Sequence, residues 1–551
     1  MPTGADLIAS ALADAGVGIA FGLPGTHNLA LWRALGATAV RVVGTRHEQG
    51  AAAAADGYAR ASGGLGVALV TTGPGAANTL GAVGEAWASG TPLLVIATDI
   101  ATTLRRPGVY RGALHETTDQ AAMFAPVTKA TVRVAKPTEL YAAVQMAVFT
   151  ATDAPTRPVY LEVPTDLLSA DVSAGYLRAD IDDARRRLPD QSAAAAATAL
   201  LREAHRPLLW AGGGALRAGA GPAVGQLAER LAAPVLTTFG ARGLLAPAHP
   251  CAVGLPPHVP AVGDLWDDAD LVVAIGTDFD GSMTQNWRQP APPALVTINL
   301  DPADAAKAYD PTVVLAADAR LGTETLVDLL DAPTDGSALE DLRTRLAGLR
   351  AQVRTDLTAQ DPQAVAFLDA VDQALPPGTT VLADMCVAGY WYAAFGVVAG
   401  PRRLAYPVGW GTLGFAFSAA LGAALAGPGP VLSICGDGGF LMTCGELATA
   451  AQEQLPLTAL VVDDQGYGML RYDQQLAGDP PLGVDLVSPD FAALAGSFGI
   501  PAETVDGFGD DFRDALTAHL ARPGPSLLAV RGSLTPPPTT SPRWYRPATA
   551  P

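Results

Sequence analysis

The chain has 551 residues, of which 49% are hydrophobic, and its formal net charge is −19 with only 35 Lys and Arg residues. This length predicts about three domains of ordinary size, and the hydrophobic content is sufficient for their cores. Because nucleic-acid-binding proteins normally carry a basic face, the acidic balance argues against a nucleic-acid partner.

The amino-terminal segment and the cysteine spacing indicate in which cellular compartment the protein is expected. Residues 1–6 have no charged stretch before an apolar one, and the long Ala, Val and Leu runs are interrupted by Gly, Pro or charged residues. We therefore expect neither a signal peptide nor a membrane-spanning helix. Cys251, Cys386, Cys435 and Cys444 show no CxxC spacing, so neither a zinc site nor a disulfide framework is predicted. Cytoplasmic residence is the resulting expectation.

Short apolar runs alternate with Ala-rich amphipathic segments along most of the chain, which predicts an α/β fold of three doubly wound parallel-sheet domains. The first domain is expected over residues 1–175. Its predicted strands are Gly18 to Gly22, Ala39 to Val43, Leu65 to Thr71, Pro92 to Ala97 and Pro158 to Val163, with helices over Ala51 to Ala61 and Ala76 to Ala88.

A charged linker, Asp180 to Pro189, leads to a central Rossmann-like domain expected over residues 190–335. Its predicted strands are Pro207 to Trp210, Pro234 to Thr238, Leu271 to Ile275 and Leu295 to Asn299. A helix-rich polar stretch around 336–365 precedes the third domain, 360–535, and we expect the proline-rich tail 536–551 to be extended.

The most informative motif lies in the third domain. Asp437, in Gly436-Asp437-Gly438-Gly439, and Asp464 each follow an apolar run, and helical sequence separates the two runs. A right-handed strand–helix–strand crossover brings both strand ends to one edge of a parallel sheet. Carboxylate oxygens suit Mg²⁺, and glycine N–H groups allow close approach of a diphosphate. Gly-Asp-Gly is also an ordinary tight turn, but the second aspartate at this spacing favours a cation and phosphate site.

At these residues the chain resembles the thiamine-diphosphate enzymes of the acetolactate synthase and 2-oxo acid decarboxylase family, and the resemblance extends over nearly the whole chain. It implies pyrimidine-binding, central and diphosphate-binding domains in that order. It also implies Mg²⁺ ligands from Asp437, Asp464 and the Gly466 carbonyl. The residues that it places against the diphosphate are Gly438, Gly439, Gly466, Tyr467, Gly468 and Met469.

Two segments depart from the family pattern. Where the family carries two asparagines after the second strand, this chain has Asp463-Asp464, which keeps an oxygen ligand, adds negative charge and leaves the metal preference open. In Cys386 to Gly389, the polar residues that help to hold the diphosphate in acetolactate synthases are replaced. Some diphosphate contacts are therefore not carried over.

Arg46-His47-Glu48, before an Ala-rich helix, resembles the activating-glutamate segment of the family. By itself, Glu48 is more typical of a first-turn carboxylate that interacts with the helix dipole. The resemblance instead implies that Glu48 binds the aminopyrimidine ring and promotes loss of the thiazolium C2 proton.

Two turns near the amino terminus also resemble cofactor- or substrate-facing turns. In the first, Thr26 takes a position that often faces substrate, and His27 is either a loop imidazole bonded to a carbonyl or a proton-transfer group. In the second, residues 72–78, the resemblance places Pro74 and Asn78 beside the aminopyrimidine ring, although Gly-Pro is also an ordinary turn and helix start.

In the third domain, residues 409–415 resemble the family segment that wedges an apolar side chain between the two cofactor rings. The resemblance places Gly411 and Leu413 at the cofactor, with Leu413 as the wedge. Without the resemblance, Leu413 is an ordinary core residue.

His115-Glu116 stands where acetolactate synthases carry Phe-Gln, and with Arg111 to Leu114 before it the pattern is closer to the 5-guanidino-2-oxopentanoate decarboxylases. A carboxylate at Glu116 suits a cationic substrate end. The alternative is an internal ion pair of Glu116 with Arg111 or Lys129. The candidate catalytic residues are Glu48, Thr26, His27, His115 and Glu116.

The central domain binds FAD in acetolactate synthases, but two features argue against FAD here. Residues 212–215 lack the spacing of a full dinucleotide motif, and Met283 stands where the flavin site of the family carries Arg. We expect thiamine diphosphate and Mg²⁺ as cofactors, and no FAD.

The resemblance implies thiamine-diphosphate- and Mg²⁺-dependent decarboxylation of a 2-oxo acid through an enamine intermediate. The alternative is a carboligase that joins the enamine to a second carbonyl compound. A non-catalytic cofactor-binding paralogue is less favoured, because Glu48 and both metal-position carboxylates are present. Active sites between subunits are typical of the family, so a homodimer or homotetramer is implied.

Overall fold

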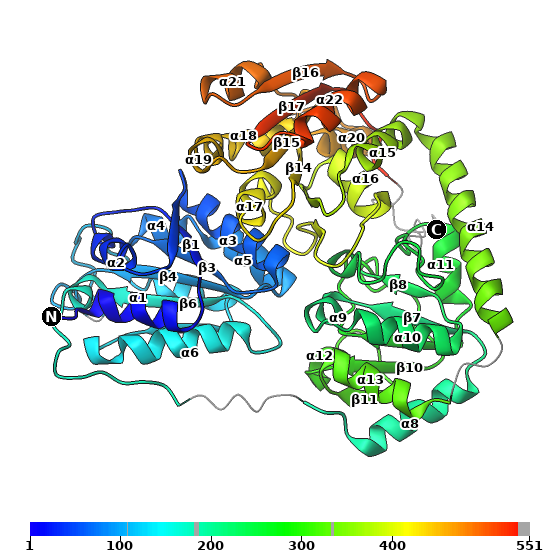
Figure 1. Cartoon of the computed structure of the whole chain (residues 1–551), viewed down its shortest axis with the longest axis horizontal. Coiled ribbons are helices and arrows are strands. Elements are labelled where there is room, and N and C mark those ends of the chain that lie inside the picture. The colour runs from blue at the N-terminus through cyan, green and yellow to red at the C-terminus, as the bar shows by residue number, and fades with distance from the viewer. Residues whose placement is uncertain (107, 181–186, 332–335, 538–551) are drawn as a thin grey trace.

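A computed structural model of the chain describes residues 1–106, 108–180, 187–331 and 336–537. Most of the predicted linker (181–186) and of the predicted tail (538–551) lies outside these ranges. Within them, the chain forms three parallel β-sheets, each covered by helices (Figure 1). The predicted fold class of three doubly wound α/β domains is confirmed.

The amino-terminal sheet has the strand order β2-β1-β3-β4-β6-β5. Its strands are β1 (Ile19–Gly22), β2 (Arg41–Gly44), β3 (Gly66–Val70), β4 (Leu93–Asp99), β5 (Ala130–Arg133) and β6 (Val159–Pro164). Its helices are α1 (Gly4–Asp14), α2 (Leu29–Leu35), α3 (Glu48–Ser62), α4 (Pro74–Ala77), α5 (Leu80–Ser89), α6 (Leu140–Thr152) and α7 (Thr165–Leu168). The edge strand β5 was not predicted, because half-buried residues alternate there with exposed ones and no apolar run marks it.

One predicted helix was wrong in its continuity. The expected helix Ala76 to Ala88 is two helices, α4 and α5, separated by Asn78 and Thr79. The Thr79 hydroxyl donates to the Ala76 carbonyl (2.7 Å), and the Asn78 side chain points to Glu48. Short polar side chains that bond locally compete with helix continuation, which explains the break.

The central sheet has the strand order β11-β10-β9-β7-β8. Its strands are β7 (Pro207–Ala211), β8 (Val235–Thr237), β9 (Leu271–Ile275), β10 (Leu295–Asn299) and β11 (Val313–Ala316). Its helices are α8 (Gln191–Glu203), α9 (Gly213–Arg217), α10 (Gly221–Leu231), α11 (Pro260–Asp267), α12 (Pro302–Ala305) and α13 (Ala319–Leu329). All four predicted strands are present, and β11 is an additional edge strand.

The carboxyl-terminal sheet has the strand order β13-β12-β14-β15-β17-β16. Its strands are β12 (Thr380–Ala383), β13 (Leu404–Ala405), β14 (Val431–Gly436), β15 (Leu457–Asp463), β16 (Ala502–Asp506) and β17 (Ser526–Arg531). Its helices are α15 (Pro362–Ala374), α16 (Val387–Phe395), α17 (Phe415–Ala423), α18 (Asp437–Leu441), α19 (Leu447–Glu453), α20 (Gly468–Ala477), α21 (Phe491–Ser497) and α22 (Asp510–Leu520). Strands β14 and β15 pair directly, so Asp437 and Asp464 follow neighbouring strand ends.

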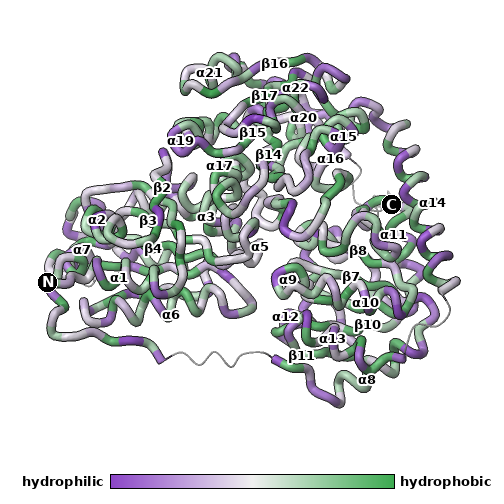
Figure 2. The backbone as a smooth tube through the Cα atoms, in the orientation of Figure 1, coloured by the Kyte–Doolittle hydropathy of each residue, from purple (hydrophilic) through white to green (hydrophobic). Residues whose placement is uncertain are grey.

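The helix-rich stretch between the central and carboxyl-terminal sheets is the long helix α14 (Gly336–Gln360). Figure 2 shows hydrophilic and hydrophobic residues mixed along it, while hydrophobic residues predominate in the strands. Its buried residues are Leu342, Leu346, Val353 and Leu357, which recur at helical spacing and pack on one face. No helix in the described ranges combines the length and apolar character needed to cross a membrane.

Helices α3 and α17 join the amino-terminal and carboxyl-terminal domains. A Cβ atom on Gly57 would lie 2.0 Å from the Ala419 carbonyl oxygen, and one on Gly422 would lie 1.7 Å from the Ala54 carbonyl oxygen. Side chains at these two positions would separate the helices, so glycine permits the close crossing. The crossing fixes the position of Glu48, the first residue of α3.

Candidate functional site

Glu48 is held from two sides. It begins α3 immediately after the turn that follows β2, is only 8% exposed, and accepts a hydrogen bond at Oε2 from the Asn78 side chain (3.0 Å). The preceding N–H groups, of Arg46 and His47, both donate to Glu446 Oε1 at 3.0 Å. A buried carboxylate of the third domain therefore positions the turn that presents Glu48.

The turn after β3 brings Pro74 and Asn78 to the same region. Gly73 has a φ of +66°, and a Cβ atom there would lie 2.6 Å from the His115 carbonyl oxygen, so the turn requires glycine. The Gly73 N–H donates to Gln120 Oε1 (2.6 Å), while Gln120 Nε2 donates to the Thr98 carbonyl (2.9 Å) and to the Tyr160 hydroxyl (2.7 Å). Gln120 is buried, so it joins the turn to the ends of neighbouring strands.

His27 and His115 lie together. Their ring centroids are 5.1 Å apart in an edge-to-face arrangement, and each Nδ1 is buried without a hydrogen-bond partner among the described residues. Burial lowers the pKa of His27, His115 lowers it further and the Asp99 carboxylate opposes the shift. His27 is therefore neutral near pH 7. Thr26 is exposed beside it in the turn after β1.

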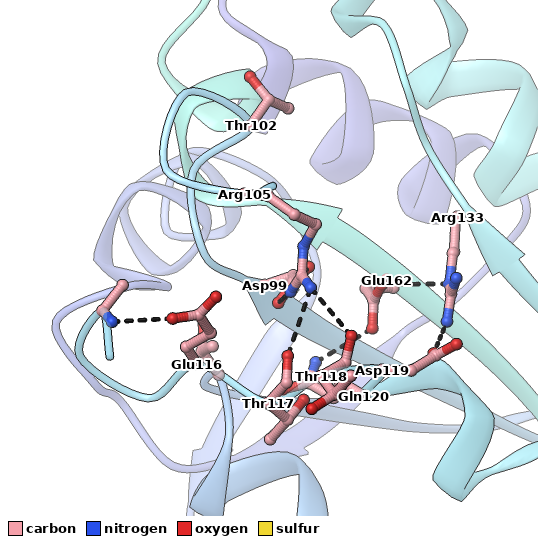
Figure 3. Close-up of polar contacts among 12 residues, drawn as sticks. Asp99, Thr102, Arg105, Glu116, Thr117, Thr118, Asp119, Gln120, Arg133 and Glu162 are labelled. Atoms are coloured by element: carbon pink, nitrogen blue, oxygen red, sulfur yellow. Dashed lines mark hydrogen bonds and ion pairs between the residues drawn. The ribbon is translucent and has the colours of Figure 1, made fainter. Parts of the chain in front are cut away.

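The segment between β4 and Gln120 carries His115 and Glu116, and Figure 3 shows Glu116. Glu116 Oε2 accepts the backbone N–H groups of Ala113 (2.9 Å) and Arg111 (3.0 Å). The Ala113 N–H is the main cause of a lowered Glu116 pKa. The Arg111 guanidinium instead donates to the Leu104 carbonyl, and Lys129 lies 3.7 Å from Asp153. Glu116 thus stabilises the turn of its own segment.

A network of charged residues lies behind this segment. Arg105 pairs with Asp99, and Arg133 pairs with Asp119 and with Glu162 at 3.4 Å (Figure 3). Burial and the nearby Asp99 carboxylate raise the pKa of Glu162 to about 6. Asp99, Asp119 and Glu162 thus form a group of carboxylates, and Asp99 is the one that acts on His27.

The Glu162→Gln variant is expected to gain stability relative to the parent protein as pH rises. The folded chain binds this proton more tightly than the unfolded chain, in which the carboxyl pKa is 4.5. Ionisation of Glu162 thus lowers stability between pH 4.5 and about 6, by up to about 2 kcal/mol in total. Denaturant unfolding at pH 4.5 and pH 7.5 measures the change. A stability difference that is the same at both pH values would contradict it; the exposed Glu203→Gln is the control.

The carboxyl-terminal half of the site forms around Asp437, the first residue of α18. Asp437 Oδ1 accepts the Gly438 N–H (2.7 Å), and Oδ2 accepts the Gly466 N–H (2.8 Å). The Ser488 hydroxyl lies 3.0 Å from Asp437 Oδ2 and 2.8 Å from Asp463 Oδ1. Ser488 therefore connects the first residue of the Asp463-Asp464 pair to Asp437.

The predicted diphosphate and metal residues line one cavity of about 130 Å³. The members predicted from the sequence are Leu413, Asp437, Gly438, Gly439, Asp464, Gly466, Tyr467, Gly468 and Met469. A Cβ atom on Gly438 would lie 2.6 Å from the Tyr467 ring, and one on Gly439 would lie 2.9 Å from Asp384 Oδ2. The glycines thus keep this wall of the cavity free of side chains.

The donor set of the cavity fits a hard cation. Burial, and then the Asp437 carboxylate, raise the pKa of Asp464 to about 6, and burial also raises the pKa of Asp437. Two carboxylates that disfavour each other's charge are stabilised by a bound divalent cation. Asp437, Asp464 and the Gly466 carbonyl could hold Mg²⁺, and the glycine-lined wall leaves room for a diphosphate.

The loop that carries Gly411 and Leu413 lies against the first domain. The Thr412 hydroxyl lies 3.5 Å from the Gly81 carbonyl oxygen, and Gly84 leaves room for the Trp410 ring. The Gly414 N–H donates to Asp384 Oδ2 (2.9 Å). Asp384, which is buried in the same cavity wall, thus fixes the loop beside Leu413.

Among the residues that the structure describes, the cavity around Asp437 does not extend to Glu48. The cavity around Asp437 is lined by residues between Asp384 and Leu534, and Glu48 and Asn78 are not among them. Glu48 begins α3 and Asp437 begins α18, and both are buried. Glu48 therefore does not border the cavity around Asp437 of the same chain.

A separate cavity of about 470 Å³ lies at the carboxyl edge of the central sheet. It is bordered by Gly213, Gly214 and Met283, the residues on which the expectation of no FAD depends, and by Arg157 and Arg217. That expectation stays a prediction.

Several positioning residues were missed by sequence reasoning. Glu446, Gln120, Asp384 and Ser488 hold predicted site residues from distant parts of the chain. Asp384 follows an apolar strand, which is a usable signal, whereas nothing in their sequence neighbourhoods marks the other three.

Comparison with known proteins identifies three domains of one enzyme family in this chain. Three family models match: the thiamine pyrophosphate enzyme N-terminal TPP binding domain over residues 2–123, the central domain over 194–329, and the C-terminal TPP binding domain over 384–530. Thiamine pyrophosphate is thiamine diphosphate under another name.

Relatives of known sequence span almost the whole chain. A probable 2-ketoarginine decarboxylase of Pseudomonas aeruginosa is 38% identical over 94% of this chain and 92% of its own length. A probable acetolactate synthase large subunit of Methanocaldococcus jannaschii is 32% identical over 96% and 91%, respectively. The acetolactate synthase isozyme 1 large subunit of Escherichia coli is 29% identical over 96% and 94%. The chain therefore belongs to the thiamine-diphosphate enzyme family, as a thiamine-diphosphate-dependent enzyme of its decarboxylase and carboligase group.

Proposed function

We propose that the chain decarboxylates a 2-oxo acid whose side chain ends in a guanidinium group, with thiamine diphosphate and Mg²⁺ as cofactors. The main support for the proposed reaction is that Glu48 is buried and oriented by Asn78. The same chain also contains the cavity around Asp437. The substrate class is supported by the 38% identical relative, whose name specifies 2-ketoarginine, which is 5-guanidino-2-oxopentanoate. The buried Asp99 carboxylate, which raises the pKa of His27 against the effect of burial, agrees with a cationic substrate.

Each cofactor-binding residue is assigned a separate role. Glu48 Oε2 is engaged by Asn78, which leaves Oε1 to hold the proton at the aminopyrimidine ring. Asp437, Asp464 and the Gly466 carbonyl would bind Mg²⁺, with the diphosphate against Gly438, Gly439, Tyr467, Gly468 and Met469. Leu413 would separate the two cofactor rings. When bound, the cofactor supplies the electron sink for the loss of CO₂.

The substrate side is assigned to the residues around the two histidines. Thr26, beside His27, is proposed to face the substrate. Because His27 is neutral and its Nδ1 has no partner among the described residues, we assign it the proton transfer that releases an aldehyde. Pro74 and Gly411 complete the turns that border the cofactor.

We propose that a complete site needs a second copy of the chain. Because Glu48 does not line the cavity around Asp437 of the same chain, we propose a homodimer or homotetramer in which each site takes Glu48 from one copy and Asp437 from another. The domain boundaries near residues 175–190 and 335–360 and residence in the cytoplasm stay predictions.

A panel of 2-oxo acids tests the proposed reaction. With thiamine diphosphate and Mg²⁺, 5-guanidino-2-oxopentanoate is expected to release CO₂ and yield 4-guanidinobutanal, identified by mass, faster than pyruvate is consumed. The acetolactate synthase relatives favour a second candidate, carboligation. Acetolactate formed from pyruvate, without aldehyde from the guanidino substrate, would support that candidate and overturn the decarboxylase proposal.

A further inference from the structure

The Asp99 carboxylate acts on the pKa of His27 and binds a guanidinium group of the protein itself, that of Arg105 (Figure 3). Arg105 Nη2 lies 2.6 Å from both carboxylate oxygens of Asp99, and Nη1 lies 3.3 Å from the Thr117 carbonyl oxygen and 3.4 Å from that of Thr118. We propose that Asp99 and these two carbonyl groups recognise the guanidinium end of the substrate, and that Arg105 leaves the site when substrate binds. This inference rests on the proposed function.

Asp99 is placed where a substrate-recognising carboxylate is needed. It is the last residue of β4, at the same edge of the sheet as the turns that carry His27 and Pro74, and it is 3% exposed. The negative charge of Asp99 raises the pKa of His27, whereas burial lowers it. A carboxylate so removed from water binds a matching cation strongly and tolerates a neutral group poorly.

The geometry of Arg105 is that of an exchangeable partner. A single nitrogen contacts both Asp99 oxygens, so the parallel two-nitrogen pairing that makes Arg–carboxylate contacts strongest is not formed. The contacts with the two carbonyls are long, and the Arg105 side chain is 29% exposed. Arg60, by contrast, uses Nε and Nη2 on the two Asp56 oxygens and also pairs with Glu85. Because Asp99 is buried, Arg105 can move into water only when another cation takes its place on that carboxylate.

The chemical match between occupant and substrate supports the exchange. An arginine side chain and 5-guanidino-2-oxopentanoate carry the same guanidinium group on a three-carbon chain. The substrate can remake each bond that Arg105 gives up, while an uncharged substrate leaves the resident pair in place and gains nothing from Asp99. Replacement of Arg105 by the substrate thus makes the enzyme selective for substrates that carry a guanidinium group.

Two other carboxylates of the region are less suited to this role. Glu116 already accepts two backbone N–H groups of its own turn. Glu162 is contacted by Arg133 and Gln120, and its raised pKa reflects its distance from water and its proximity to Asp99. Glu162 adds negative potential around Asp99, whereas Asp99 has Arg105 as its partner.

Kinetics with two matched substrates test the assignment. The probes are 5-guanidino-2-oxopentanoate and 5-ureido-2-oxopentanoate, which differ only in the charged end group. Asp99→Asn is expected to lower kcat/KM for the guanidino substrate by about 30- to 100-fold and to change the ureido value by less than about 3-fold. Arg105→Gln, which removes the competing guanidinium, is expected to lower KM for the guanidino substrate by about 3- to 10-fold.

With the guanidino substrate, Asp99→Asn is expected to impair the enzyme and Arg105→Gln to improve it. If the ion pair were only structural, both variants would instead be impaired with both substrates. The double variant Asp99→Asn/Arg105→Gln leaves no unpaired charge at this pair and should keep the ureido activity while losing the guanidino preference. A preference that survives in Asp99→Asn, or that is lost in Glu116→Gln instead, overturns the assignment of Asp99. A parent enzyme that processes both substrates equally overturns the proposed substrate class itself.

Discussion

The Glu48→Gln variant is expected to bind thiamine diphosphate and Mg²⁺ but to lose at least about 100-fold in kcat. Glutamine keeps the size of the side chain and its contact with Asn78, yet it cannot hold the proton at the aminopyrimidine ring. Glu48 is buried between Asn78 and the turn fixed by Glu446, so water cannot readily replace it. Steady-state rates with saturating cofactor, together with cofactor titration by tryptophan fluorescence, separate loss of catalysis from loss of binding.

Two further variants serve as comparisons for the effect of Glu48→Gln on kcat. Glu203→Gln makes the same chemical change on an exposed helix residue and should leave kcat unchanged. Asn78→Ala removes the partner of Glu48 and should have an intermediate effect, because the carboxylate remains but is less well oriented. Intact turnover in Glu48→Gln would show that the activating role is wrong.

The Asp437→Asn variant is expected to weaken Mg²⁺-dependent binding of thiamine diphosphate by at least about 100-fold. Three donors, the Gly438 and Gly466 N–H groups and the Ser488 hydroxyl, orient the carboxylate. An amide would turn an N–H₂ group toward one of these donors and lose the charge that the cation needs. Calorimetric titration of thiamine diphosphate with and without Mg²⁺ measures the loss.

Asp464→Asn is the matched comparison for Asp437→Asn. It restores the amide typical of the family and removes one of two carboxylates that raise each other's cost of ionisation. We expect it to retain cofactor binding and to shift the preference between Mg²⁺ and other divalent cations. Equal and complete loss of binding in both variants would mean that two carboxylates are required, and normal binding in Asp437→Asn would contradict its assignment as a ligand.

Much of the fold is predictable because parallel strands covered on both faces read as apolar runs bounded by glycine, proline or polar residues. β3, β9 and β14 are of this kind and are fully or almost fully buried. β5 and β11 escape prediction because they lie at sheet edges, where half-buried and exposed residues weaken the pattern. The predicted helix through Asn78 fails because that side chain bonds to Glu48, a tertiary contact.

The candidate site is predictable where its residues follow strand ends, as Glu48, Asp437 and Asp464 do. The residues that position them are not, since Glu446 and Ser488 act across long sequence separations. The sequence marks His115 as a candidate residue but does not predict the conformation of its segment. His115 has a φ of +66°, which is uncommon for a residue other than glycine, and its carbonyl packs closely against Gly73.

Glu48 and Asp437 are proposed to serve one cofactor, with Glu48 from one copy of the chain and Asp437 from another. Mixing the two inactive variants, Glu48→Gln and Asp437→Asn, under conditions that exchange subunits tests this directly. Mixed dimers would contain one site with both native residues, so about a quarter of the parent activity is expected from an equal mixture. If native mass spectrometry shows that mixed dimers form and these dimers release no CO₂ from the 2-oxo acid, Glu48 and Asp437 of different copies do not share one site.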